Sequence, residues 1–222
     1  MTELYLSSAA FIAAHLVPTY LPLRQALVRL LGERLYIALF IILSIGLSIW
    51  LAVAFIQAPY VEVWQQSEWH RWASLLIMPL SCLLGFIGLT SYNPFSFGLG
   101  FKQYDPARPG VVRLTRHPVI WAMALWSAAH IVTNGDEAGI TLFAMMLALS
   151  ALGANSMRRR RKAALGPEHW QQLQQTSGST PLTTALMQIK LWQWLGGIVL
   201  FGGLIALHEI VIGVSPLPGE LI

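Results

Sequence analysis

Long apolar stretches alternate with short polar segments along most of the chain. An α-helix rises about 1.5 Å per residue, so about 20 apolar residues cross the roughly 30 Å of hydrocarbon in a bilayer. Six stretches meet or approach this length: residues 4–21, 35–56, 72–89, 119–132, 139–154 and 191–213. The pattern predicts an all-α, polytopic membrane helical bundle of about six transmembrane helices, in a single domain over residues 1–222.

The fourth and fifth stretches are separated by a short polar segment, Asn134-Gly135-Asp136-Glu137. Its residues favour a tight turn, so these two stretches are expected to form a helical hairpin. The loop between the third and fourth stretches is different, because it is long and contains Asn93-Pro94, Asp105-Pro106 and Pro109-Gly110. Turn chemistry therefore dominates that loop.

The composition agrees with a membrane protein. Charged residues make up 11% of the 222 residues, against about 25% in a soluble domain. Nine Trp and six Tyr residues suit the membrane interface. The net charge of +4 does not indicate a nucleic-acid partner, because basic loops are the ordinary mark of a membrane protein's cytoplasmic side. The expected surroundings are the lipid bilayer.

The positive charges are sorted to one side. Thirteen of the fourteen Lys and Arg residues fall in three alternate connecting segments: Arg24, Arg29, Arg34, Lys102, Arg108, Arg113, Arg116, Arg158, Arg159, Arg160, Arg161, Lys162 and Lys190. Only Arg71 falls on the other side. The positive-inside rule then predicts cytoplasmic basic loops, an even number of helices and both termini on the outer, periplasmic side. The run of five at 158–162 is expected to fix this topology; binding of anionic lipid headgroups is the alternative.

Three histidines lie in apolar stretches: His15, His130 and His208. Ionisable groups are costly there, so a functional site is one interpretation, and a neutral histidine hydrogen-bonded to a neighbouring helix is the other. Neutral imidazole is a good ligand for haem iron. The chain has no CxxCH, so any haem would be held non-covalently. The motifs of common soluble enzymes are also missing, which leaves open whether the protein is an enzyme.

His117 belongs to a separate group. It lies thirteen residues before His130, about 20 Å along a continuous helix, so the two cannot ligate one iron. Pro118 is typical of a first helical turn, and Thr115 is a possible cap. One interpretation is a helix start with a basic flank. The other is a polar or anionic ligand held at the helix N-terminus by free N–H groups and Arg116.

Several motifs together resemble the NnrU family. They are His15-Leu16, Leu31-Gly32-Glu33-Arg34-Leu35-Tyr36, Thr115-Arg116-His117-Pro118, Ala129-His130, Asn134-Gly135-Asp136 and Gly166-Pro167-Glu168-His169-Trp170. This resemblance implies a protein of the bacterial inner (plasma) membrane linked to denitrification and nitric oxide metabolism. Respiratory or denitrification enzymes are the partners it implies.

The NnrU family is related to zeta-carotene isomerase of plants, a membrane enzyme with haem b. By this resemblance, two intramembrane histidines of that enzyme correspond to His15 and His130. These two residues are therefore the expected haem iron ligands. His208 is the reserve ligand, since it is expected at a depth near that of His130. An adjacent histidine pair of the relative is replaced by Leu147-Ala148-Leu149. The replacement argues against carotenoid isomerisation, which is retained only as an alternative.

A second resemblance is to isoprenylcysteine and phospholipid methyltransferases. It rests on Arg116-His117-Pro118 and on Glu168 in the later Gly166–Trp170 segment, and it implies an S-adenosylmethionine site on the cytoplasmic face. Trp170 stands where that family usually has Tyr. Because of the resemblance, a membrane methyltransferase is the rival hypothesis, although Trp170 departs from the pattern of that family. A non-catalytic membrane factor is the third.

Overall fold

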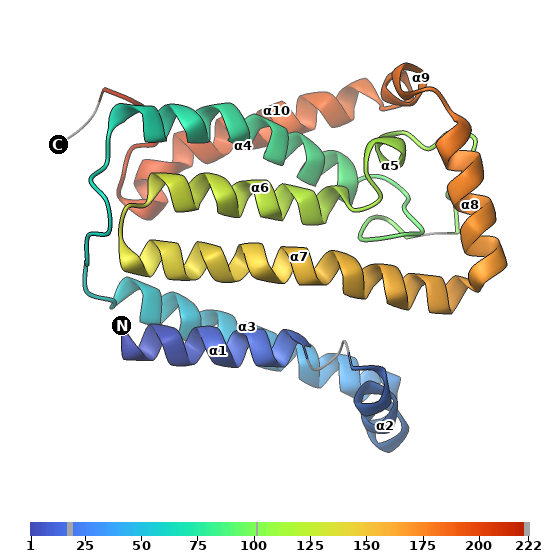
Figure 1. Cartoon of the computed structure of the whole chain (residues 1–222), viewed down its shortest axis with the longest axis horizontal. Coiled ribbons are helices and arrows are strands. Elements are labelled where there is room, and N and C mark those ends of the chain that lie inside the picture. Colours follow the sequence, from blue (N-terminus) through green and yellow to red (C-terminus); the bar gives the residue numbers. More distant parts are fainter. Residues whose placement is uncertain (17–19, 101, 220–222) are drawn as a thin grey trace. The chain divides into compact units, whose positions relative to one another are not determined.

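The computed structural model describes residues 1–16, 20–100 and 102–219, and over these the chain is helical with no strand (Figure 1). A single antiparallel bridge joins Glu62 and Asp136. In chain order the helices are α1 (Thr2–Leu16), α2 (Leu21–Leu31), α3 (Glu33–Ile56), α4 (Glu68–Leu89), α5 (Val111–Leu114), α6 (Pro118–Thr133), α7 (Glu137–Leu165), α8 (Pro167–Ser179), α9 (Leu182–Met187) and α10 (Leu191–Ile212).

The predicted all-α membrane bundle is confirmed, since each of the six predicted stretches contains a helix. Four helices of the described chain, α3, α4, α7 and α10, are long and apolar enough to cross a membrane. The 16-residue α6 is a shorter apolar helix. The first predicted stretch contains α1, and its residues 17–19 lie outside the described chain. Such helices place the protein in contact with lipid.

One predicted boundary was wrong. The fifth stretch was expected to end at residue 154, but α7 continues through the arginine run to Leu165. Arg and Lys are good helix formers, so the helix has no local reason to stop where its apolar part ends. It stops where Gly166 adopts a φ of 80°, which ends the helix and starts α8. The loops also contain short helices that the apolar pattern did not predict: α2, α5, α8 and α9.

The described chain divides into two compact units. Residues 1–65 and 134–145 form the first unit, and residues 66–133 and 146–222 form the second. The prediction of one domain stays a prediction. In the first unit, α1 packs against α3, and the chain around residue 63 pairs with the turn before α7. The backbone N–H of Val63 donates to Gly135 O at 2.7 Å, and that of Glu137 donates to Val61 O at 2.9 Å.

The turn before α7 forms as predicted. The Asp136 carboxylate accepts the backbone N–H of Gly139 at 2.8 Å, which caps the helix. Gly135 lies against Trp64, and a Cβ at this position would approach Trp64 O to 2.2 Å. Only glycine therefore fits at this point of the turn.

The second unit is built around α4, which packs against both α6 and α10. Ser81 donates to Ala122 O at 2.7 Å, and Ser74, earlier on α4, donates to Ala129 O, later on α6, at 3.1 Å. Gln193, in the first turn of α10, donates to Thr90 Oγ1 at 3.1 Å, just after α4 ends. The helices α6 and α10 therefore both run antiparallel to α4. Their basic flanks, with Arg116 and Lys190, lie at the same end of this unit.

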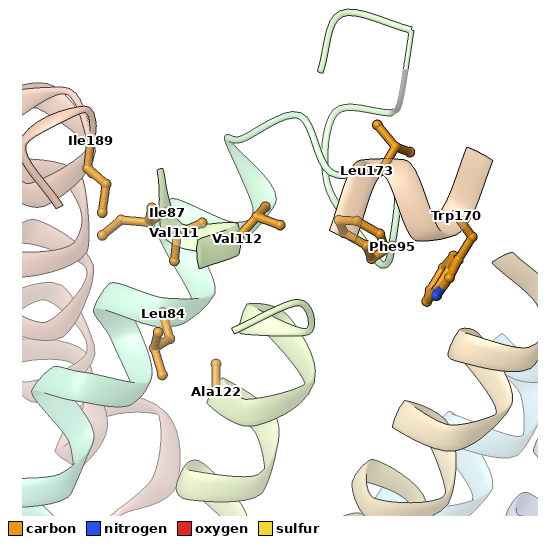
Figure 2. Packing of buried hydrophobic residues seen from close by; sticks show 9 residues of the cluster. All are labelled: Leu84, Ile87, Phe95, Val111, Val112, Ala122, Trp170, Leu173 and Ile189. Atoms are coloured by element: carbon orange, nitrogen blue, oxygen red, sulfur yellow. The ribbon is translucent and has the colours of Figure 1, made fainter. Parts of the chain in front are cut away.

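A compact hydrophobic core closes that end of the second unit (Figure 2). It joins the ends of α4, α5 and α6 to α8 and to the loop after α4. Its members are Leu84, Ile87, Phe95, Val111, Val112, Ala122, Trp170, Leu173 and Ile189. Phe95, with no exposed surface, lies on the loop that turn chemistry dominates. The loops at this end are thus packed as in a soluble protein.

The close approach of α10 to α4 depends on glycine. A Cβ on Gly197 would lie 2.7 Å from Leu83 Cδ2 and 3.0 Å from Leu83 Cα, whereas one on Gly203 would meet nothing within 4 Å. We expect Gly197→Ala to lower the free energy of unfolding by about 1–3 kcal/mol through overpacking. Gly203→Ala is the control in the same helix and should be neutral or stabilising. Thermal unfolding in detergent measures both, and equal stabilities would contradict the packing.

Candidate functional site

A pocket of about 370 Å³ opens at the basic end of the second unit. This volume is within the range of small-molecule sites. Four elements contribute to it: α5, the segment leading into α6, the C-terminal part of α7, and α8. Phe95 adds a side chain from the loop after α4.

The charged side chains of this pocket are all cationic. Arg113, Arg116 and Arg158 line it, and among its described lining residues there is no Asp or Glu. Arg113 Nε donates to Thr180 O at 2.8 Å, which holds its side chain against the start of the α8–α9 link. Arg116 lies over the Phe95 ring at 5.9 Å from its centroid. The pocket is therefore an electropositive recess with two of its three guanidinium groups held in place.

Arg116 is held by a buried asparagine. Asn93 has no exposed surface, and its Nδ2 donates to Arg116 O at 3.1 Å. Its Oδ1 accepts the backbone N–H groups of Phe95, at 2.9 Å, and Ser96, at 3.2 Å. The same side chain thus shapes the loop after α4 and anchors the backbone that leads into α6. Gly98 completes this loop, because a Cβ there would lie 2.4 Å from Ser91 O.

Trp170 connects α8 to the pocket. Its ring is 4% exposed and meets Phe95 edge to face, with centroids 4.9 Å apart. Phe95 in turn lies under Arg116. On the same helix Ser177 lines the pocket and shares a hydrogen bond of 2.7 Å with Tyr104. Burial raises the pKa of Tyr104, so this phenol stays protonated at neutral pH.

His117 lies on the pocket wall at the start of α6. Its backbone N–H donates to Thr115 Oγ1 at 3.2 Å, so the predicted capping residue does bind near the helix start. Its Nδ1 is buried and has no hydrogen-bond partner among the described residues. Burial, and then the charges of Arg116 and Arg158, lower the pKa of His117. The ring is therefore neutral at pH 7.

The residues of the methyltransferase hypothesis are only partly brought together. Arg116 and His117 line the pocket, but Glu168 is exposed in the first turn of α8 and lines neither this pocket nor a second one beside Tyr104 and His169. A sulfonium ligand carries positive charge, and this wall offers it three arginines. The arrangement therefore favours an anion over S-adenosylmethionine.

The three histidines of the apolar stretches share one hydrogen-bond pattern. His15 Nδ1 lies 2.8 Å from Phe11 O, His130 Nδ1 lies 2.8 Å from Trp126 O, and His208 Nδ1 lies 2.7 Å from Val214 O. A carbonyl oxygen can only accept, so Nδ1 carries the proton in each ring. Nε2 is then unprotonated in each ring, which is the tautomer in which imidazole ligates a metal through Nε2.

These histidines belong to both units. His15 lies on α1 in the first unit, stacked on Phe11 at 4.1 Å between ring centroids. His130 on α6 and His208 on α10 lie in the second unit, close enough to interact electrostatically. No three His, Cys, Asp or Glu side chains gather as a metal site within the described chain. A haem iron needs only one or two protein ligands.

The features of this chain match one protein family. The NnrU protein family matches residues 3–216, which include both the pocket and the three histidines. The chain belongs to the NnrU family. No curated protein and no solved structure is significantly similar to this NnrU protein.

Several residues that line or support the pocket of this NnrU protein were not predicted as site residues. Asn93 and Phe95 stood in a loop that was interpreted by its turn chemistry alone, and Arg158 was one of a run that was expected to fix topology. The available signal was the group of apolar residues, Phe95 among them, within a loop rich in turn residues. A buried aromatic residue there indicates that the loop has a core of its own.

The shifted pKa of His117 can be tested directly. Since Arg158 helps to lower this pKa, Arg158→Gln should raise it towards its ordinary value, and Arg159→Gln, whose charge does not line the pocket, should change it less. Histidine-selective NMR of the detergent-solubilised protein measures the titration, with His117→Gln assigning the signal. A pKa that both variants shift equally would contradict the placement of Arg158.

Proposed function

We propose that this NnrU protein is a b-type haem protein of the bacterial inner membrane that acts in nitric-oxide-linked redox metabolism during denitrification. In this proposal the basic loops face the cytoplasm and both termini face the periplasm. His130 is one ligand of the haem iron. His15 is the second, with His208 in reserve.

The observation that carries the proposal is the orientation of the three imidazoles. A neutral ring whose Nδ1–H is bonded to a carbonyl carries no proton on Nε2, the atom that would ligate iron, and hydrogen bonds of this kind orient histidine ligands in metal sites. His130 is held in this way by Trp126 O at 2.8 Å. These residues would therefore fit as protein ligands of a haem iron.

The chain's own side chains supply an apolar environment for such a group. Phe11 and Phe40 lie beside the His15 ring, at 4.1 and 5.8 Å between ring centroids, and Trp126 lies beside His130 at 5.3 Å. Aromatic walls exclude water and give flat surfaces for a porphyrin. Haem supplies one-electron chemistry and binding of diatomic gases when it is present.

Two histidines compete for the second ligand position. The resemblance to zeta-carotene isomerase supports His15. Proximity supports His208, because it lies in the same unit as His130 and within electrostatic range of it. Both rings have the required Nδ1 partner, so substitution has to decide between them.

The decisive measurement is a visible absorption spectrum of protein purified in detergent after expression with ample haem precursor. We expect a Soret band that shifts on reduction. His130→Ala should reduce the haem content by about tenfold or more, since loss even of groups that only support a ligand costs 10–100-fold in metal affinity. A protein without a Soret band would overturn the proposal.

Matched histidine variants serve as controls. His117→Ala should keep the haem band, because His117 lies about 20 Å from His130 along α6. Of His15→Ala and His208→Ala, the variant that converts a six-coordinate low-spin spectrum to a high-spin one identifies the second ligand. Stopped-flow mixing of the reduced protein with nitric oxide then tests the redox role, and an unchanged spectrum would contradict it.

A further inference from the structure

We propose that the pocket lined by Arg113, Arg116 and Arg158 binds a phosphate group. The ligand is either the headgroup of an anionic phospholipid or a soluble phosphate compound. This site is distinct from the proposed haem site: His117 lines it, and His130 lies about 20 Å further along α6.

The first argument is uncompensated charge. Three arginines line a pocket of about 370 Å³ without a carboxylate among its described lining residues. The ion pair between Arg24 and Glu33 lies in the other unit. Guanidinium groups bind phosphate by paired, charge-assisted hydrogen bonds. A dianionic or diphosphate ligand would balance most of the charge of this wall.

The second argument is that the cations are positioned. Asn93 fixes the backbone of Arg116, the Phe95 ring lies against its guanidinium group, and Thr180 O holds Arg113 Nε. A charge that only keeps a loop on the cytoplasmic side of the membrane needs no fixed side-chain geometry. Groups held in place lose less entropy when they bind a ligand.

The third argument is the polar lining between the arginines. Thr115 Oγ1 accepts the backbone N–H of His117, which leaves its own O–H free to donate into the pocket. Gln174 and Asn155 add side-chain amide donors. His117 keeps a buried Nδ1 with no partner among the described residues, beside two of the arginines. Protonation of this ring would add a further donor once an anion offsets their charge.

The position of the pocket leaves both sources of phosphate open. It lies at the ends of apolar helices, where headgroups are found, and it is also formed by α5 and α8, which are too short or too polar to be spans. Its volume suits one phosphate group with a small substituent. The experiment therefore has one arm for each source.

The soluble arm is isothermal titration calorimetry of the full chain with sodium pyrophosphate. The protein is held in an uncharged maltoside detergent at constant ionic strength. The lipid arm is native mass spectrometry of the same protein with phosphatidic acid, and with diacylglycerol as the lipid that lacks the phosphate. Saturable binding of pyrophosphate alone identifies a soluble ligand, and selective binding of phosphatidic acid identifies a headgroup.

Arg158 and Arg159 provide a matched pair of variants. Both side chains are exposed, they are adjacent on α7, and only Arg158 lines the pocket. We expect Arg158→Gln to weaken binding about tenfold and Arg159→Gln to weaken it less than about twofold. Unchanged thermal unfolding of both variants confirms that they fold. Absence of saturable binding in both arms, or equal weakening by the two variants, would overturn the proposal.

Discussion

The hydrocarbon of a membrane offers no partner to a backbone N–H or C=O group, so each must be satisfied within the chain. Helices alone meet this demand over the apolar stretches of the sequence, and irregular backbone is confined to their ends. In the second unit the irregular segment between α4 and α6 is therefore gathered at one end. There Asn93 satisfies three backbone groups, and Phe95 closes a core that the loops share with α8. The pocket exists because these loops are packed.

The same demand explains the side chains inside the apolar helices. Ser48, Ser127, Thr133 and Ser150 each donate to the carbonyl four residues earlier. His15 and His130 do the same through Nδ1. A helix therefore satisfies one nitrogen of a half-buried histidine by itself, whatever the protein does. This bond leaves Nε2 without a proton, so a function for these rings has to be sought at that atom.

The sequence predicted the membrane bundle well because apolar length is a one-dimensional property. The six stretches, the turn at Asn134–Glu137 and the helix start at Pro118 could be predicted from local residues. The end of α7 could not, since the helix propensity of the arginine run outweighed the change in polarity. The pocket was predicted only in part: Arg116 and His117 stood out in a motif. Phe95 and Arg158 line it, and Asn93 supports it, through contacts between distant segments, which a periodic pattern does not contain.

The arginines at this end of the protein can orient it in the membrane or recognise a ligand. The surroundings of each arginine indicate which of the two it is suited to. A charge that orients a membrane protein acts through its position in the sequence, and any solvated side chain would suffice. Arg159 fits that description, because it is exposed and lines neither of the two pockets described above. Arg116 does not fit it, since a fully buried asparagine and an aromatic ring hold it beside an uncharged histidine. Packing of this kind fixes where a charge points, which matters for recognition of a ligand and is irrelevant to topology.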